Sequence, residues 1–216
     1  MAASESVPDP VLLALVASWA NDQANILLGY VWVAYDSMRE NMPYVDPRDL
    51  ERSITQLLEP RISDAMTGDE PFYIQHGPFE HETMASPPAQ PPTYDLAFVL
   101  RADERVMWPI EAKVLETPKT LAEYERDIRQ EFLTCRYGPF SGAGAMLGYL
   151  LTGTAAEALK AIEAKLGCAL YVVPSFAARP HRVSNHRRIV PVGKNYPADF
   201  HCYHLIFEYT ELTRAM

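Results

Sequence analysis

Two runs of alternating apolar residues, separated by a short polar turn at 101–105, constrain the fold of this chain most strongly. In the first run Leu96, Phe98 and Leu100 share one face of an extended segment, and in the second Ile110 and Ala112 do so. Alternation of this kind predicts two strands whose apolar faces pack against a layer of helices. The short turn predicts that the two strands are antiparallel neighbours.

Three charged side chains fall on the opposite face of this predicted hairpin. If the turn is centred on Asp103, paired residues have numbers that sum to 206, which places Asp95 opposite Glu111. Directly opposed residues have Cβ atoms about 5 Å apart, and Lys113 shares the face of Glu111 because side chains alternate along a strand. Two carboxylates and a lysine at one end of a hairpin favour a hard cation such as Mg²⁺ or Mn²⁺ among them. The pattern therefore predicts a metal-dependent enzyme.

Two features limit this interpretation of the hairpin. Pro109 lacks an N–H donor, so the second strand is predicted to lie at an edge or to contain a bulge, and a bulge would change the register. A buried structural ion network of Asp95, Glu111 and Lys113, with no metal, is the alternative to a catalytic site.

The tetrapeptide Ile-Glu-Ala-Lys occurs twice, and its two contexts predict different structures. The copy at 110–113 lies in the predicted strand. The copy at 162–165 lies in an alanine-rich segment that ends at Gly167, which predicts a helix with a C-terminal stop. Residues two apart on a helix point about 200° apart, so Glu163 and Lys165 cannot share a site.

An aspartate that opens one strand, followed by Glu-x-Lys on the next, resembles the PD-(D/E)XK nuclease superfamily. The resemblance implies a restriction-endonuclease-like α/β fold, in which a central mixed β-sheet is flanked by α-helices. It also implies that Asp95, Glu111 and the backbone carbonyl of Ala112 hold Mg²⁺, with Mn²⁺ as a substitute, and that Lys113 orients or deprotonates the attacking water. Tyr94 departs from the family's name, because it stands where a proline precedes the aspartate.

The resemblance extends to two predicted helices. The segment 49–58 resembles the N-terminal helix that carries another acidic residue in such nucleases, which makes Glu51 the fourth catalytic residue, with Glu59 as its alternative. A helix is predicted over 121–136, and a polar residue on the helix after Glu-x-Lys often reaches the site in this superfamily. Gln130 is the candidate for that substrate-binding position.

Composition predicts one domain. A chain of 216 residues with 48% hydrophobic residues can bury a single sizeable core, so we expect one domain over 1–216, with helices at about 10–66 and the sheet at about 72–210. Three scattered cysteines form no metal or disulfide pattern, which favours a reducing, cytoplasmic location. The first ten residues do not resemble a signal peptide, and the apolar run at 26–35 is shorter than the ~20 residues that span a membrane.

The formal net charge of −9 argues against nucleic-acid binding, because such proteins usually carry a basic surface. One segment, 179–188, has four arginines, two histidines and no acidic residue. We predict a loop here that contacts phosphates through Arg182, His186, Arg187 and Arg188; a merely solvated loop between strands is the alternative. A protein partner would then supply much of the affinity for the substrate.

The expected function is Mg²⁺-dependent hydrolysis of phosphodiester bonds, with DNA favoured over RNA as the substrate of an endonuclease. The resemblance extends to stand-alone bacterial nucleases of phage defence. Double-strand cleavage would call for two active sites and hence for a homodimer, and a protein partner would supply recognition or activation. Two alternatives stay open: a ribonuclease with the same site, and a catalytically silent nuclease fold that serves as a binding or assembly module.

Overall fold

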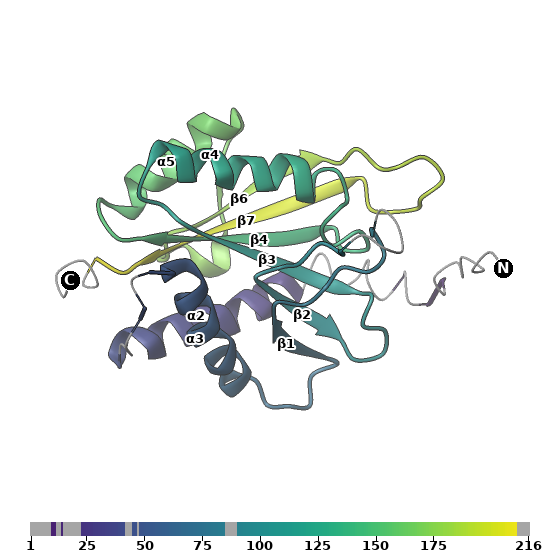
Figure 1. Ribbon diagram of the computed structural model, residues 1–216, viewed down its shortest axis with the longest axis horizontal. Helices are drawn as coiled ribbons and strands as arrows, with labels where there is room; N and C mark the ends of the chain where they lie inside the picture. The colour runs from purple at the N-terminus through teal and green to yellow at the C-terminus, as the bar shows by residue number, and fades with distance from the viewer. Residues whose placement is uncertain are drawn as a thin grey trace.

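The computed structural model describes residues 10–11, 14, 23–41, 45–46, 48–84 and 90–210. In this part of the chain, seven strands form one open mixed sheet in the order β1-β2-β3-β4-β7-β6-β5. Helices α2 and α3 cover one face of the sheet and α4 and α5 cover the other (Figure 1). The predicted α/β class, with a mixed sheet flanked by helices, is confirmed.

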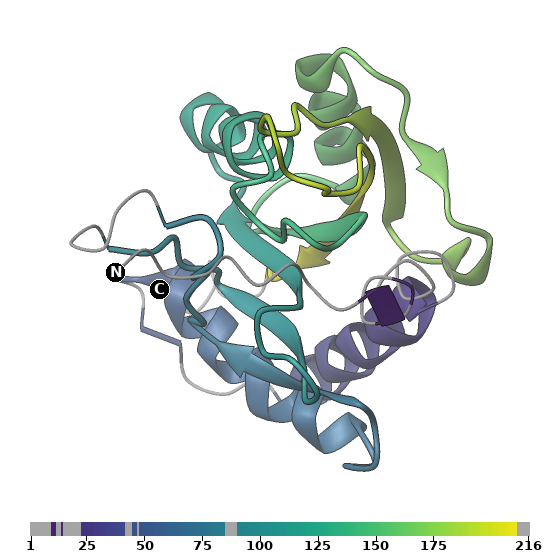
Figure 2. The same cartoon turned by 90° about the vertical axis from the view of Figure 1, so that its right-hand side faces the viewer.

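The directions of the strands follow from the connections between them. The strands are β1 (Phe72–His76), β2 (Leu96–Leu100), β3 (Met107–Val114), β4 (Ala143–Leu150), β5 (Tyr171–Val172), β6 (His181–Arg187) and β7 (Asp199–Glu208). Strands β1, β2 and β3 form an antiparallel meander, whereas β3, β4 and β7 run parallel. Parallel neighbours need a crossover connection, and α4 (Pro118–Asp127) makes the one between β3 and β4, as Figure 2 shows from the side.

The register of the predicted hairpin is confirmed, because Leu96 pairs with Ile110 and Val99 with Met107, and each pair sums to 206. The prediction of an edge or bulge at Pro109 is wrong. This proline pairs with Ala97 in an unbroken register on a strand that has neighbours on both sides. Its ring has room because Gly138 lies against it: a Cβ on that glycine would be 2.7 Å from Cγ of the proline.

Alternation along β2 and β3 divides the apolar residues between two cores. Leu96, Phe98 and Ile110 belong to the core beneath α2 (Ala24–Glu40) and α3 (Leu50–Ala65). Val99 and Met107 belong to the core beneath α4 and α5 (Ala155–Leu166). The charged face of the hairpin therefore lies on the α4 and α5 side of the sheet.

The helices differ from prediction mainly at their ends. Gly29 favours a break in the first predicted helix, and Asp46-Pro47 predicts the start of the second. In the structure α2 is continuous through Gly29, and α3 begins after Asp49. The predicted start of the first helix falls largely on 12–13 and 15–22, outside the described residues. Helix α5 ends as predicted at Gly167, in a left-handed conformation with φ +69°. In the described part of the chain, no helix combines the length and apolarity needed to cross a bilayer.

Three further predictions need correction. The predicted basic loop at 179–188 is mostly strand β6, which pairs with β7 along its whole length. The sequence also predicts a strand at 169–174, but only the two residues Tyr171 and Val172 form one, β5. The helix expected over 121–136 is α4 followed by a π-helical turn, η2 (Ile128–Phe132). The proline-rich composition of 76–92 predicts an extended loop, of which residues 85–89 lie outside the described residues.

We expect Gly144→Ala to destabilise the protein, because its Cβ would lie 2.9 Å from Cε1 of Phe132 and 3.0 Å from the carbonyl oxygen of Pro109. Overpacking of this kind costs about 1–3 kcal/mol, which corresponds to a decrease of roughly 2–12 °C in Tm for a chain of this size. Gly29→Ala is the control, because no atom lies within 4 Å of its Cβ and alanine favours a helix. Equal thermal stability of the two variants would contradict this account of the packing between β3 and β4.

Candidate active site

The site forms where strand β2 begins, because the residues of β3 beyond this point have no strand partner on one edge. Pairing between the two strands stops at Leu96 and Ile110, so residues 112–114 of β3 have a free edge on that side. Two carboxylates occupy this free edge: Asp95 accepts a hydrogen bond of 2.7 Å from the N–H of Ala112, and Glu51 accepts one of 3.1 Å from Val114. These acidic side chains satisfy donors that a longer β2 would have satisfied.

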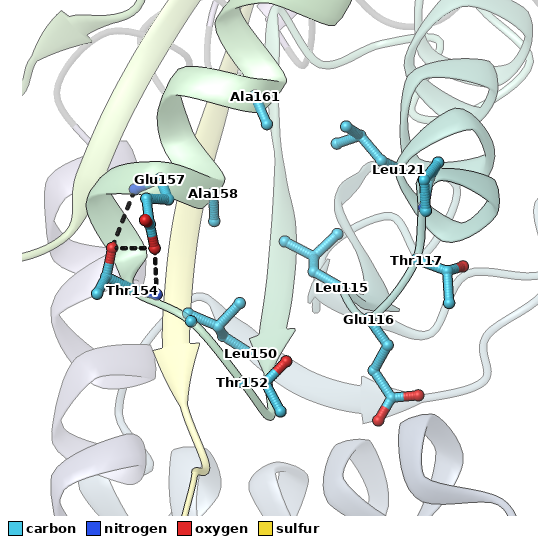
Figure 3. A pocket seen from close by; sticks show the side chains of 12 residues that line it. Leu115, Glu116, Thr117, Leu121, Leu150, Thr152, Thr154, Glu157, Ala158 and Ala161 are labelled. Carbon is cyan, nitrogen blue, oxygen red and sulfur yellow. Dashed lines mark hydrogen bonds between the residues drawn. The ribbon is translucent and has the colours of Figure 1, made fainter.

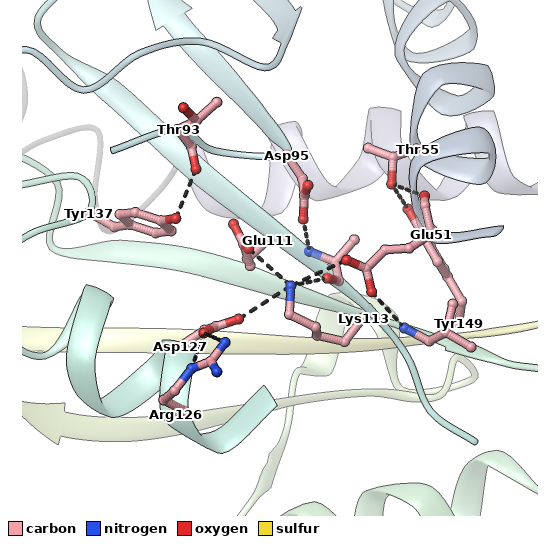
Figure 4. A network of polar contacts seen from close by, with 12 residues as sticks. Glu51, Thr55, Thr93, Asp95, Glu111, Lys113, Arg126, Asp127, Tyr137 and Tyr149 are labelled. Atoms are coloured by element: carbon pink, nitrogen blue, oxygen red, sulfur yellow. Dashed lines mark hydrogen bonds and ion pairs between the residues drawn. The ribbon is translucent and has the colours of Figure 1, made fainter. Parts of the chain in front are cut away.

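Lys113 lies at the centre of the site (Figure 4). Its ammonium donates to the carbonyl of Ala112 at 2.7 Å and to Glu111 Oε1 at 3.1 Å. Asp127 Oδ2 lies 3.2 Å from the same nitrogen and Glu51 Oε1 lies 3.4 Å from it. Helix α3, strand β3 and helix α4 thus all bring an acid to one lysine, and Asp95 lies at the same free edge. We call these five charged residues the Lys113 cluster; its members are Glu51, Asp95, Glu111, Lys113 and Asp127.

The cluster holds more negative than positive charge in a largely buried place. The Lys113 side chain is 11% exposed, and the exposed guanidinium of Arg126 adds one positive charge at the rim, 3.1 Å from Asp127. The second carboxylate oxygen of Glu111, Oε2, is buried and has no hydrogen-bond partner among the described residues. A buried carboxylate oxygen without a hydrogen-bond donor destabilises the folded protein. A bound cation, or protonation of a carboxylate, would relieve this destabilisation.

The pKa values reflect this excess of charge. Burial raises the pKa of Glu111 well above its ordinary range, and the nearby charge of Asp95 adds to the effect. Burial likewise raises the pKa of Asp95 and of Glu51. For Lys113, burial acts to lower the pKa, but the surrounding carboxylates, Glu111 foremost, raise it above its ordinary value. The lysine is therefore a permanent cation at physiological pH.

Asp127 is the member of the cluster that sequence reasoning missed. It is the last residue of α4, immediately before the π-helical turn. The expected residue of this region, Gln130, lies on that turn and is exposed; the described contacts of Lys113 include Asp127 instead. A signal was present in the sequence, because Asp127 follows Tyr124 by three residues and precedes Ile128, both of which are buried. An acid on the apolar face of a helix points to a buried polar contact.

Tyr94, which replaces the proline of the family's name, fixes the backbone just before Asp95. Its hydroxyl donates to Glu80 and accepts a hydrogen bond of 2.8 Å from the N–H of Gly138. Glu80 also accepts from the backbone N–H of Glu82 at 2.9 Å. Burial raises the pKa of Glu80 to about 7. The tyrosine thus connects two separate segments, one at Glu80 and one at Gly138, to the start of β2.

Behind Glu51, a second hydrogen-bonded pair supports the start of α3. The hydroxyl of Thr55 donates to the backbone carbonyl of Glu51 at 2.7 Å and shares a hydrogen bond of 2.9 Å with the hydroxyl of Tyr149 on β4. Glu51 is therefore held by its own helix and by the sheet, while Glu59 takes no part in the described contacts of Lys113.

The predicted phosphate-binding residues do not form a free basic strip. Arg188 is buried, and its guanidinium donates to the carbonyls of Tyr137, Gly138 and Ser141. The prediction that Arg188 contacts phosphates is therefore corrected. Sequence could not show this, because an arginine in a polar segment looks the same whether its partners are carbonyls or phosphates. Arg187 remains exposed and forms a 2.9 Å ion pair with an aspartate on β7.

The other two candidates, Arg182 and His186, are half-buried on β6. Arg182 donates to the adjacent carbonyl of His181 at 2.7 Å, and His186 shares a 2.7 Å hydrogen bond with Ser184. Through the sheet register Arg182 lies in the same row as Glu111, three strands away, or roughly 14 Å. The structure thus does not bring these residues to the Lys113 cluster.

The donor set of the cluster fits a hard divalent ion. Asp95 and Glu111 supply carboxylate oxygens, and Ala112 supplies a carbonyl oxygen, which are the ligands that Mg²⁺ and Mn²⁺ prefer. In the structure the lysine ammonium takes up Glu111 Oε1 and the Ala112 carbonyl. Among the described residues, no three side chains of His, Cys, Asp or Glu converge closely enough to surround an ion. The third ligand would therefore come from the backbone.

A cavity of about 300 Å³ lies between the N-terminal ends of α4 and α5 (Figure 3), and no member of the Lys113 cluster is among its lining residues. Leu115, Leu121 and Leu150 line it, and Glu116 and Glu157 stand at its polar side. Glu157 is engaged in capping α5, because it accepts from the hydroxyl of the N-cap threonine at 2.8 Å. The acidic side chains disfavour passage of a nucleic-acid backbone along this cavity.

Comparison of the chain with protein-family models, with curated proteins and with solved structures finds no match.

The raised pKa values of Glu51, Asp95 and Glu111 predict that the contribution of the Lys113 cluster to stability falls with increasing pH when divalent metal is absent. A carboxyl group with a raised folded-state pKa keeps its proton longer in the folded state, so its contribution is complete below about pH 4 and is lost as the pH rises through the folded value. We expect Glu111→Gln to raise the free energy of unfolding at pH 8 by on the order of 1 kcal/mol, with a smaller effect toward pH 4. Urea denaturation in EDTA at several pH values measures this.

The control is Glu163→Gln, which changes the exposed glutamate of the second Ile-Glu-Ala-Lys copy. Its effect should stay within about 0.5 kcal/mol at every pH. A destabilised Glu111→Gln variant at pH 8 would show that the ionised carboxylate is fully compensated in the metal-free protein.

Proposed function

We propose that the protein is a Mg²⁺-dependent nuclease whose active site is the Lys113 cluster, with DNA as the favoured substrate. The observation that carries the proposal is the excess of buried carboxylates at the free edge of β3, with Glu111 Oε2 left without a donor in the described part of the chain. A protein does not gain stability from such an arrangement. Clusters that conflict with stability in this way are typical of functional sites.

Asp95, Glu111 and the carbonyl of Ala112 would hold the metal. A bound Mg²⁺ or Mn²⁺ polarises a phosphate oxygen and lowers the pKa of a coordinated water. Asp95 is already oriented by its 2.7 Å hydrogen bond from the Ala112 N–H. Glu111 is oriented by Lys113 at 3.1 Å. The protein thus presents two carboxylates in fixed positions, which lowers the cost of ordering them upon metal binding.

Lys113 would act as a cation rather than as a general base. Its raised pKa keeps it protonated, so it cannot readily take a proton from water at neutral pH. An ammonium in this position donates to a phosphate oxygen and offsets the negative charge that develops in the transition state. Glu51 and Asp127 hold the side chain from two helices, and we assign them positioning roles.

The net charge of the chain would contribute little to the binding of a nucleic-acid substrate. The chain has a net charge of −9, and of the arginines of β6, Arg182 donates to a backbone carbonyl and Arg187 forms an ion pair on the surface. Affinity from phosphate neutralisation is therefore low. A protein partner that supplies recognition, or a homodimer that supplies two sites for double-strand cleavage, fits this shortage of basic surface. The same site would serve a ribonuclease.

A structural ion network in a catalytically silent binding module is the second candidate. It is favoured by the two hydrogen bonds through which Asp95 and Glu51 satisfy backbone N–H groups of β3. In that case the acids complete the sheet edge and need no metal. Metal binding separates the two candidates, because only the active site uses the Ala112 carbonyl and Glu111 Oε2 as ligands.

The nuclease proposal predicts cleavage of nucleic acid in Mg²⁺ or Mn²⁺ that depends on Lys113. We expect Lys113→Ala to lower the cleavage rate by about 10²-fold or more, since it removes a cation next to the developing charge. Supercoiled plasmid, linear duplex, single-stranded DNA and RNA, resolved on gels, form the substrate panel.

Lys165→Ala is the matched control, because Lys165 ends the second Ile-Glu-Ala-Lys copy and pairs on the surface with Glu125 at 3.4 Å. It should cleave like the wild type. Equal activity of all three proteins would assign the cleavage to a contaminant or to another site. Inactivity of all three, on every substrate, would shift the interpretation to a partner-dependent nuclease or a silent module.

Calorimetric titration with Mn²⁺ tests the metal site independently of cleavage. Wild-type protein should show saturable binding that increases from pH 6 to pH 8, because the raised pKa values of Asp95 and Glu111 make protons compete with the metal. The double variant Asp95→Ala with Glu111→Ala should lose this binding. Binding that survives both substitutions, or no binding by the wild type, would contradict the metal site.

A further inference from the structure

A second hollow of about 300 Å³ lies over β1, β2 and the start of β3, and the segments 78–81 and 104–105 complete its wall. Aromatic and apolar side chains form most of its wall, including Tyr73, Phe79, Val99 and Met107. The polar part of the wall is formed by Gln75, His81, Glu104 and Arg105. The volume is at the lower end of the range for small-ligand pockets. A flat aromatic ring with polar edges matches this combination of walls and hydrogen-bonding groups.

Phe79 makes this hollow unusual, because 44% of a large aromatic side chain is exposed at its rim. The segment that carries it is held in place: Phe79 forms an isolated bridge with Thr93, and the backbone of Glu80 donates to Pro92 at 2.8 Å. The N–H of Tyr94 donates to the carbonyl of Pro78 at 3.1 Å. An exposed ring on a pre-ordered backbone loses little freedom when it binds a ligand.

The hollow shares a face of the sheet with the Lys113 cluster. Met107, which lines the hollow, and Glu111 both point to the α4 side of β3, because they are four residues apart on one strand. That separation is roughly 13 Å along the strand. The same ladder links the two places, since the N–H of Gly77 donates to the carbonyl of Asp95 at 3.0 Å. A chain with successive phosphates and bases could occupy both at once.

We propose that this hollow is a base-binding pocket that receives one unpaired nucleobase, stacked on Phe79, while the backbone passes the Lys113 cluster. The inference rests on the proposed nuclease function and specifies its substrate class as single-stranded nucleic acid or a strand with an extruded base. Bases inside a duplex are stacked on their neighbours and cannot enter such a pocket. Stacking also supplies affinity without basic residues, which suits a chain with a net charge of −9.

The test measures binding rather than cleavage, with EDTA present so that no metal-dependent reaction occurs. The probes are single-stranded DNA and RNA about twelve nucleotides long, the matching DNA duplex, and that duplex with one unpaired 2-aminopurine. Wild-type protein should bind the single strands and the unpaired probe at least roughly tenfold more tightly than the duplex, with quenching of the 2-aminopurine fluorescence upon stacking.

Phe79→Ala should weaken binding of the single strands by roughly 5- to 100-fold, and Phe79→Trp should retain it. Tyr171→Ala is the matched control, because Tyr171 is 55% exposed on β5 at the opposite edge of the sheet; its affinity should equal that of the wild type. Unchanged affinity in Phe79→Ala, or equal binding of the duplex and the single strands by the wild type, would overturn the pocket.

The outcomes separate this inference from the nuclease proposal. Cleavage that depends on Lys113, together with full single-strand affinity in Phe79→Ala, would refute the pocket and leave the nuclease. Loss of single-strand affinity in Phe79→Ala, in a wild type that cuts no substrate in Mg²⁺ or Mn²⁺, would support the pocket and refute the autonomous enzyme.

Discussion

The structure of the site depends on one interaction, the contact of the Lys113 ammonium with carboxylates from three directions. Glu111 lies on the same strand, Glu51 arrives from α3, and Asp127 arrives from α4. These two helices cover opposite faces of the sheet, so the lysine joins both layers of the fold. A single cation cannot neutralise this many buried carboxylates. The pKa values of Glu51 and Glu111 are raised for this reason, because burial and the neighbouring negative charge of Asp95 disfavour their ionised forms.

The excess of carboxylates has a structural origin in the length of β2. Because β2 begins at Leu96, the last residues of β3 lack a strand on one side, and the side chains of Asp95 and Glu51 accept their N–H groups. A sheet with a longer β2 would need no acids there. The shortened strand therefore opens the one place in the centre of the sheet where carboxylates, a backbone carbonyl and a lysine can meet a ligand.

The hairpin and its register could be predicted because period-2 alternation and a short turn are local properties. They place Asp95, Glu111 and Lys113 together before any tertiary structure is known, and they distinguish the two Ile-Glu-Ala-Lys copies. Asp127 could not be ranked from sequence, because its approach to Lys113 depends on how α4 crosses β3 and on the π-helical turn that follows. Arg188 was misassigned for the same reason: its three carbonyl acceptors come together only in the folded chain.

The sequence by itself determined the α/β class, the antiparallel pairing of β2 with β3, and the face on which the charged residues lie, since each follows from alternation and local turn geometry. Only the tertiary structure decided which acids surround Lys113, whether the arginines of β6 are free, and where the hollow beneath Phe79 lies. These properties depend on side chains that are distant in sequence, such as Glu51 and Asp127 on either side of Lys113. Glu51 and Asp127 reach Lys113 only because the two helical layers pack on opposite faces of the sheet, and no local sequence pattern predicts this packing.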